Sequence, residues 1–127
     1  MAYKDLTVLI VDDFSTMRRI MRNILRDLEF KTILEAEDGN AAFSVLETHS
    51  VDLIVSDWNM PNCTGLEFLK RVRADGRFKD IPFLMVTAEA QKENILQAVQ
   101  AKVSNYIVKP FTAVTLSEKL AKILPPD

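Results

Sequence analysis

Five short apolar segments recur along the chain, and each is followed by residues with helical periodicity. The first segment, residues 6–11, is almost continuously apolar rather than alternating, which is typical of a strand buried on both faces of a parallel sheet. The other segments are residues 32–36, 51–55, 82–86 and 106–108. Strands that alternate with helices in this way predict an α/β fold, in which helices cover both faces of a parallel sheet.

The segments between these strands carry apolar residues at helical spacing. After the first strand, one stripe is formed by Met17, Ile20, Met21, Ile24, Leu25 and Leu28. This stripe predicts an amphipathic helix with Ser15 as its N-cap. The arginines outside the stripe are expected on the solvated face: Arg18, Arg19, Arg22 and Arg26. Further helices are predicted over 65–72 and 93–100, after residue 39, and near the C-terminus.

Length, composition and charge fit one domain, predicted to cover residues 1–127. The chain is 48% hydrophobic and 27% charged, which is typical of a protein with one ordinary core. Its formal net charge of −2 lacks the basic surplus of nucleic-acid binders. One cysteine, Cys63, cannot form an internal disulfide, and no apolar run reaches the roughly 20 residues that span a bilayer. We therefore expect a cytoplasmic monomer without nucleic-acid or membrane partners.

Polar residues follow four of the predicted strands. Asp12 and Asp13 come after the first strand, Asp57 after the third, Thr87 after the fourth and Lys109 after the fifth. In parallel α/β sheets, ligands bind outside the carboxyl ends of the strands, so these side chains are expected to meet at one edge. The acidic residues near the end of the second strand are not assigned to this set: Glu35, Glu37 and Asp38.

Three carboxylates that converge at one edge repel one another unless a positive charge lies between them. Mg²⁺ relieves that repulsion, because it needs few protein ligands and commonly shares its coordination shell with a phosphate. An ammonium and a hydroxyl beside a carboxylate nucleophile can contact the peripheral oxygens of a transferring phosphoryl group. The set therefore predicts a Mg²⁺-dependent phosphoryl acceptor at Asp57, with Lys109 and Thr87 as the catalytic partners. Taken singly, each residue could equally serve as a turn, a cap or a surface charge.

Five motifs, in this order, resemble the receiver domains of two-component signalling, and most closely the stand-alone chemotaxis regulators. The motifs are VLIVDD at 8–13, EAEDG at 35–39, SDWNMP at 56–61, TA at 87–88 and YIVKPF at 106–111. The resemblance covers essentially the whole chain. It implies a flavodoxin-like, doubly wound (βα)5 fold whose five parallel strands have the order 2-1-3-4-5.

The resemblance also implies a role for each residue around the metal. Asp57 accepts the phosphoryl group from a chemotaxis histidine kinase. Asp13, Asp57 and the backbone carbonyl of Asn59 bind Mg²⁺ directly, and Asp12 binds it through water. Trp58 lies beside the metal, so its fluorescence is expected to respond to Mg²⁺. The protein is expected to be a signalling receiver rather than an enzyme, with self-phosphorylation and autodephosphorylation as its chemistry and a phosphatase as a further partner.

A switch connects this chemistry to a partner in the family that the chain resembles. Lys109 holds one phosphoryl oxygen, Thr87 moves toward another, and the Tyr106 ring turns inward. The bond between Lys109 and Pro110 is expected to be cis. The fourth helix, fifth strand and fifth helix then bind the flagellar motor switch. Their partner-binding residues are expected to be Lys92, Ile95, Val99, Val103, Tyr106 and Lys119.

Departures from the family pattern concern the partner rather than the chemistry. Lys102 and Asn105 replace expected glycines, Glu29 stands where a glycine would end the first helix, and Thr64 replaces an aspartate before Gly65. Because Lys102 lies on the expected output surface, one alternative stays open. The protein could be phosphorylated without binding the motor, as a phosphate sink or as the regulator of another partner.

Three other functions fit the residues less well. A haloacid-dehalogenase phosphatase needs an aspartate two positions after its nucleophile, where this chain has Asn59. A flavodoxin-like FMN site needs a glycine- and hydroxyl-rich loop after the first strand, where Asp12 and Asp13 would repel the phosphate. A pseudo-receiver, which ignores phosphate, has no use for the complete set of three aspartates, threonine and lysine.

Overall fold

Strands and helices alternate through the computed structural model, which describes residues 3–88 and 91–124. The strands of this described part are β1 (Thr7–Val11), β2 (Thr32–Ala36), β3 (Leu53–Asp57), β4 (Phe83–Thr87) and β5 (Asn105–Val108). The helices are α1 (Ser15–Asp27), α2 (Gly39–Thr48), α3 (Gly65–Ala74), α4 (Lys92–Gln100) and α5 (Ala113–Ile123). The predicted elements are all present, with their ends moved by one or two residues.

The strands form one parallel sheet with the order β2-β1-β3-β4-β5. This order confirms the doubly wound, flavodoxin-like topology that the resemblance implied. β1, β3 and β4 lie inside the sheet, and nearly all of their residues are buried, as continuous apolar runs predict. β2 and β5 are the edge strands, and most of their residues are only half-buried.

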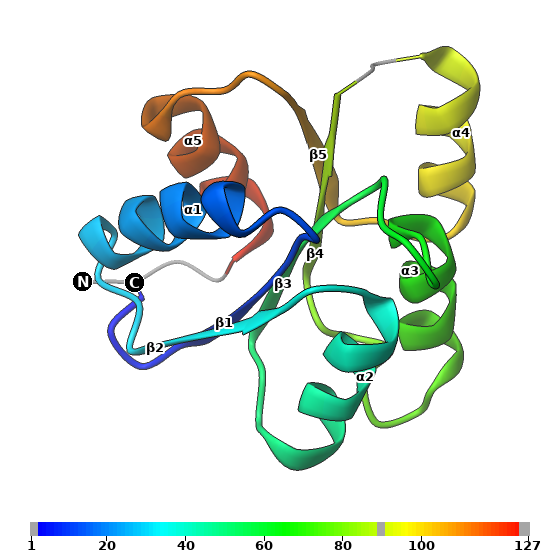
Figure 1. Cartoon of the computed structure of the whole chain (residues 1–127), viewed down its shortest axis with the longest axis horizontal. Coiled ribbons are helices and arrows are strands. Elements are labelled where there is room, and N and C mark those ends of the chain that lie inside the picture. The colour runs from blue at the N-terminus through cyan, green and yellow to red at the C-terminus, as the bar shows by residue number, and fades with distance from the viewer. Residues whose placement is uncertain (1–2, 89–90, 125–127) are drawn as a thin grey trace.

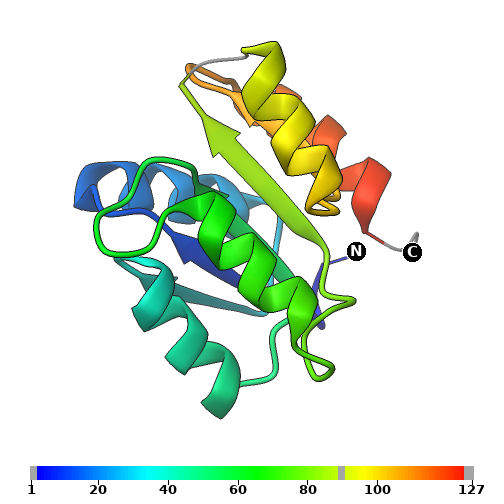
Figure 2. The same ribbon diagram turned by 90° about the vertical axis from the view of Figure 1, so that its right-hand side faces the viewer.

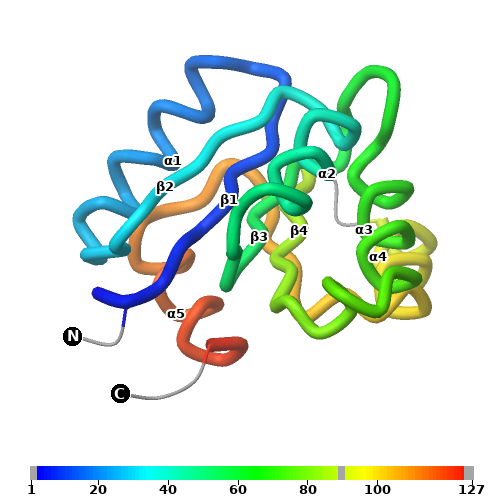
Figure 3. The backbone as a smooth tube through the Cα atoms, turned by 90° about the horizontal axis from the view of Figure 1, so that it is seen from below, coloured from blue at the N-terminus to red at the C-terminus, as the bar shows by residue number. Residues whose placement is uncertain are grey.

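Helices cover both faces of the sheet (Figure 1). α1 and α5 lie on one face, and α2, α3 and α4 lie on the other, an arrangement that is also seen from below (Figure 3). Successive residues of β1 point to opposite faces: Val8 and Ile10 pack with α1 and α5, whereas Leu9 and Val11 pack with α2 and α3. Among the described helices, none has the length and apolar character that a membrane crossing requires.

The first helix differs from its prediction in two details. Phe14 occupies the N-cap position and Ser15 is already the first helical residue, so the prediction that Ser15 caps the helix was wrong. Met21 and Leu25 are buried against the sheet, but Ile20 is 45% exposed. A six-residue stripe is wider than the face that the sheet covers, and Ile20 lies at its solvent edge.

The arginines of α1 do not all face solvent. Arg18 and Arg22 turn toward β2 and form ion pairs with Glu35, whereas Arg19 and Arg26 are exposed. The expectation of a fully solvated arginine face was therefore wrong at two positions. The reason is tertiary, because the edge strand β2 presents a carboxylate to this flank of the helix and charge-assisted hydrogen bonds hold the guanidinium groups there.

Two helices end on residues with left-handed backbone conformation. Glu29 after α1 has φ 69° and Lys102 after α4 has φ 67°. The Glu29 amide donates to the Arg26 carbonyl and the Phe30 amide to Leu25, the pattern of a Schellman motif, and the same pattern follows α4. Glycine is favoured at such positions because it lacks a Cβ. Two of the three replaced glycines of the family pattern, at Glu29 and Lys102, are thus positions where the chain tolerates backbone strain, whereas Asn105 lies in β5 without it.

The third helix begins with a capping box, which explains the threonine at position 64. The Thr64 hydroxyl accepts from the Glu67 amide at 3.2 Å, and the Glu67 carboxylate accepts from the Thr64 amide at 3.0 Å. Thr64 therefore supplies the cap that an aspartate would supply. This matters for the site, because α3 follows the loop after β3.

Arg73, near the end of α3, ties three segments together. Its guanidinium donates to the carbonyls of Lys79 and Ile81 before β4 and to the carbonyl of Lys102 after α4, at 2.6–3.0 Å. It also contacts the Ser104 hydroxyl at 3.4 Å. Burial lowers the pKa of Arg73, an effect that nearby Asp80 partly offsets. The side chain thus anchors the α4–β5 loop to the body of the domain. Figure 2 shows α3 and α4 on the side that faces the viewer.

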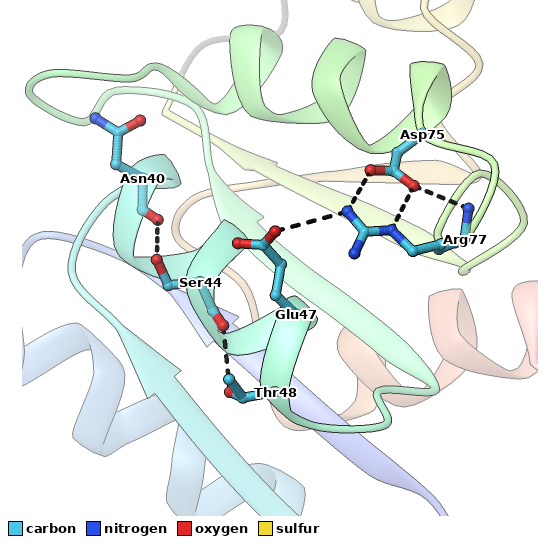
Figure 4. Close-up of polar contacts among 6 residues, drawn as sticks. All are labelled: Asn40, Ser44, Glu47, Thr48, Asp75 and Arg77. Atoms are coloured by element: carbon cyan, nitrogen blue, oxygen red, sulfur yellow. Dashed lines mark hydrogen bonds and ion pairs between the residues drawn. The ribbon is translucent and has the colours of Figure 1, made fainter.

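Exposed polar contacts lie along α2 and in the loop after α3 (Figure 4). Arg77, in the loop after α3, pairs with Asp75 at 2.8 Å and with Glu47 of α2 at 3.6 Å. Along α2, Ser44 donates to a carbonyl one turn earlier, as Thr48 does. Water screens surface pairs of this kind, so they add little to the stability of the fold. Because this loop precedes β4, Asp75 and Arg77 lie away from the carboxyl ends of the strands.

Candidate functional site

The register of the sheet brings the polar strand ends level with one another. The residue before Asp12 pairs with the residue before Asp57 across β1 and β3. Asp57 in turn pairs with the residue before Thr87, and Thr87 pairs with the residue before Lys109. The side chains selected from the sequence therefore emerge at a single edge, where backbone geometry alone places them close together.

Three carboxylates meet at this edge. Asp12 and Asp57 are 4% and 7% exposed, whereas Asp13 faces solvent at the rim. One oxygen from each lies within 4.8 Å of the others. Lys109 reaches between the two buried carboxylates, with its Nζ 3.1 Å from Asp57 Oδ1 and 3.6 Å from Asp12 Oδ2. The bond between Lys109 and Pro110 is cis.

The negative charge of the acidic cluster exceeds the positive charge that Lys109 supplies. Burial raises the pKa of Asp57, and the negative charge of Asp12 raises it further. The ammonium of Lys109 acts in the opposite direction without cancelling these effects. One ammonium therefore does not balance the acidic cluster, and a cation that bound there would stabilise the ionised form of Asp57.

The donor set fits Mg²⁺. The ion prefers oxygen ligands at about 2.1 Å and keeps several waters, so a few carboxylates on one side of it suffice. The oxygens of Asp12, Asp13 and Asp57 are close enough that small side-chain rotations bring them to one ion. Bound there, the metal would supply the positive charge that the cluster lacks. Asn59, whose carbonyl was predicted as a ligand, is exposed in the loop directly after this cluster.

A close backbone contact holds the loop that follows Asp57. The Gly65 amide donates to the Trp58 carbonyl at 2.8 Å, and the Trp58 amide donates to Val86 of β4 at 2.9 Å. A Cβ on Gly65 would lie 2.2 Å from the carbonyl oxygen of Asp57. Only glycine fits this approach of α3 to β3. Gly65 was not assigned to the site from the sequence, although a glycine at the first position of the predicted helix 65–72 was a signal for it.

Thr87 and Tyr106, the two expected switch residues, lie on neighbouring strands. Thr87 is 5% exposed at the end of β4, and its carbonyl accepts from the Lys109 amide at 2.8 Å. The half-buried Tyr106 packs against the same core as α2 and α3. Lys119 of α5 holds its Nζ 5.0 Å from the centre of the Tyr106 ring. Tyr106 and Lys119 line a surface groove of about 370 Å³ between β5 and α5.

The expected partner-binding residues of α4 and its following loop differ in exposure. Val99 is 57% exposed and Lys92 is also exposed, whereas Ile95 and Val103 are half-buried. Leu96, which was not assigned to the partner surface, is 53% exposed. The three-residue spacing of Leu96 and Val99 was the signal that both lie on one helical face. The exposed apolar surface of α4 is thus centred on this pair rather than on Ile95.

Comparison with known proteins identifies the family. The profile of the response regulator receiver domain matches residues 8–121. The chain belongs to the response regulator receiver family. This receiver is 56% identical over 120 residues to chemotaxis protein CheY-3 of Vibrio cholerae, covering 94% of this chain and 92% of that protein. It is 56% identical over 116 residues to chemotaxis protein CheY of Pseudomonas aeruginosa, with 91% and 94% covered.

A solved structure has the same arrangement as this receiver. The chemotaxis protein CheY4 of Vibrio cholerae superposes with a TM-score of 0.89 at 34% identity, covering 94% of this chain and 99% of that one. Receivers bind Mg²⁺ in an acidic pocket, and in this chain Asp12, Asp13 and Asp57 form an acidic cluster at the carboxyl ends of the strands. Family membership also makes this protein a regulator of two-component signalling rather than an enzyme of metabolism.

Proposed function

We propose that this receiver is a chemotaxis regulator that takes a phosphoryl group onto Asp57 from a histidine kinase, with Mg²⁺ bound to Asp13, Asp57 and the Asn59 carbonyl and, through water, to Asp12. The observation that carries the proposal is the buried pair of carboxylates bridged by Lys109. Burying two carboxylates side by side costs free energy of folding, and bound cations offset that cost. The names of relatives at 56% identity supply the chemotactic role.

The residues divide the work of phosphoryl transfer between them. The ionised Asp57 attacks phosphorus, so that the bond to the kinase histidine breaks while an oxygen–phosphorus bond to Asp57 forms. Lys109, already 3.1 Å from Asp57, moves onto a phosphoryl oxygen. Mg²⁺ held by Asp13 and Asp57 would supply further positive charge for the transferring group. Hydrolysis of the acyl phosphate by water, aided by a partner phosphatase, returns Asp57 to its free form.

The new charge on Asp57 then biases the switch. A phosphoryl group adds about one and a half to two negative charges and three strong acceptor oxygens. Thr87 lies on the strand next to Asp57, so its hydroxyl is within reach of a modest movement toward the new acceptor. The Tyr106 ring follows inward, and it leaves Lys119 as it moves. The partner surface of Lys92, Ile95, Val99, Val103, Tyr106 and Lys119 changes shape as a result.

The motor switch is the proposed output partner, and a phosphate sink is the alternative. The exposed pair of Leu96 and Val99 on α4 favours a protein partner, because both side chains leave apolar surface in water. We further propose that the protein acts as a monomer in the cytoplasm.

Phosphorylation can be tested by intact-mass measurement after incubation with acetyl phosphate and Mg²⁺. We expect one phosphoryl group on the wild type and on Asp5→Asn, an exposed control, and none on Asp57→Asn. Equal labelling of Asp57→Asn would refute the assignment. Trp58 fluorescence should change as Mg²⁺ is titrated, and a flat signal would contradict a metal beside Trp58.

The output can be tested with the N-terminal peptide of the motor switch protein. Phosphodonor should tighten binding to the wild type, and Val99→Ala should weaken it more than Ile20→Ala, an exposed apolar control on α1. Lys109→Ala should abolish the gain in peptide affinity that the phosphodonor produces in the wild type. It should change the affinity for Mg²⁺ less than it changes this gain. No binding to the peptide, with or without phosphodonor, in a protein that is labelled would favour the phosphate sink.

A further inference from the structure

The turn between β1 and α1 carries two of the three clustered carboxylates, and a side chain from α1 holds it from outside the cluster. Arg18 donates from Nη1 to the backbone carbonyl of Asp12 and from Nε to Glu35 Oε1 at 3.2 Å. Arg22 donates to the other oxygen of the same Glu35 carboxylate. A continuous set of charge-assisted bonds thus runs from Arg22 through Glu35 and Arg18 to Asp12.

The geometry of this set restrains the turn strongly. The guanidinium of Arg18 is planar, so its two donors have fixed directions, and fixing one on Glu35 aims the other. Because Arg22 binds the second oxygen of Glu35, the carboxylate has little freedom to rotate. The side chains are partly shielded from water, with Arg18 19% exposed and Glu35 28% exposed. Shielding strengthens each bond relative to a surface pair.

The turn needs such support because its own bonds are few. The Asp12 amide donates to the Ala36 carbonyl at 3.1 Å, and Asp12 Oδ1 accepts from the Phe14 amide at 2.9 Å. This second bond uses a side-chain oxygen of Asp12, a member of the acidic cluster, so it depends on the position of that carboxylate. The bond from Arg18 uses only the backbone carbonyl of Asp12, and it can persist while the carboxylate rearranges.

We propose that Arg18 and Glu35 are positioning residues for the metal ligands of the β1–α1 turn. They hold the Asp12 backbone in place before the metal arrives, so that Mg²⁺ binding does not have to order the turn. The proposal rests on the proposed function, since it takes Mg²⁺ as the ligand of the acidic cluster. Partners that orient metal ligands in this way typically change affinity about 10- to 100-fold. Here the contact is to one backbone atom, so we expect the lower end of that range.

The test is calorimetric titration of Mg²⁺ into a matched series of variants, with urea unfolding of the metal-free proteins measured alongside. We expect Arg18→Met to raise the Kd of Mg²⁺ by about tenfold and Arg22→Met by less, because Arg22 acts only through Glu35. Arg19→Met removes the same charge from an exposed neighbouring position, and it should leave the Kd within about twofold. Glu35→Gln combined with Arg18→Met should be no weaker than Arg18→Met alone, because both act through one contact.

A purely structural ion pair would lower unfolding stability in these variants without changing the Kd, and that result would overturn the proposal. Equal losses of Mg²⁺ affinity in Arg18→Met and Arg19→Met would also overturn it, because they would indicate a general charge effect. Hydrogen exchange of the Phe14 amide in the metal-free protein separates this proposal from the proposed function. We expect Arg18→Met to speed that exchange and Arg18→Lys, which keeps a donor, to restore part of the protection. Unchanged exchange would refute the positioning role even if Mg²⁺ bound nowhere.

Discussion

Neutralising Asp57 should stabilise the metal-free protein, although it removes an ion pair. The side chain is 7% exposed, and its pKa is raised because burial and the charge of Asp12 disfavour the ionised form. Asp57→Asn keeps the shape of the side chain and removes the charge. The variant therefore isolates the electrostatic cost of the site from its packing.

The size of the effect follows from the distances. At an effective dielectric constant of 20, a carboxylate within 4.8 Å repels Asp57 by roughly 3 kcal/mol, and Lys109 at 3.1 Å attracts it by roughly 5 kcal/mol. Asp12 supplies that repulsion in full, and exposed Asp13 supplies a screened share. Removing the charged group from water costs several kcal/mol more, so the ionised residue is destabilising on balance. We expect Asp57→Asn to raise the free energy of unfolding by about 1–2 kcal/mol at neutral pH.

The pH dependence of the unfolding free energy gives an independent sign for the contribution of Asp57. A carboxyl group with a raised native pKa binds its proton in the folded state at a pH where the unfolded chain has lost it. The penalty at Asp57 is therefore present above the native pKa, and it is relieved as the pH falls through that value toward the ordinary pKa of an aspartate. The advantage of Asp57→Asn should shrink over this acidic window. With Mg²⁺ at 100 times its Kd, the wild type should gain about 2.7 kcal/mol, which reverses the order.

Urea unfolding followed by far-ultraviolet circular dichroism measures these quantities without depending on Trp58. Asp5→Asn is the matched control, since it removes an exposed carboxylate outside the site. A variant Asp57→Asn that is less stable than the wild type without Mg²⁺ would refute the reasoning. An equal gain in Asp5→Asn would also refute it, because the effect would then reflect net charge alone.

Three further substitutions test the supporting structure. Lys102→Gly should raise the free energy of unfolding by about 0.5–1 kcal/mol because it relieves a left-handed residue. Gln97→Gly, at an exposed position inside α4, should lower it by about 1 kcal/mol, and a loss in both variants would contradict the strain at Lys102. Gly65→Ala should lower the melting temperature through a loss of about 2–3 kcal/mol, because its Cβ would meet the Asp57 carbonyl. Gly76→Ala, with no described atom within 4 Å of the added Cβ, should change it little, and equal melting temperatures for both variants would count against the close contact. Arg73→Met should cost about 2 kcal/mol and speed hydrogen exchange at residues 101–104, and unchanged exchange there would exclude an anchoring role.

Local pattern was enough to predict the elements and the acidic site. The buried strands β1, β3 and β4 have continuous apolar runs, and a run of that kind has few alternatives in an α/β chain. Because parallel strands end at the same edge, the residues after them could be grouped before any coordinates were known. The strand order came from the resemblance to receivers, since periodicity says which face of a strand is buried and not which strand lies beside it.

Contacts between elements were decided by the tertiary structure. Arg18 and Arg22 looked like solvated charges because the helix pattern contains no information about Glu35 on another strand. Leu96 is exposed and Ile95 half-buried because the orientation of α4 on the sheet depends on contacts that its own sequence pattern does not specify. A sequence specifies the apolar and polar faces of each element through its period. Which charge meets which, and how much of an apolar face stays in water, depends on neighbours that are distant along the chain.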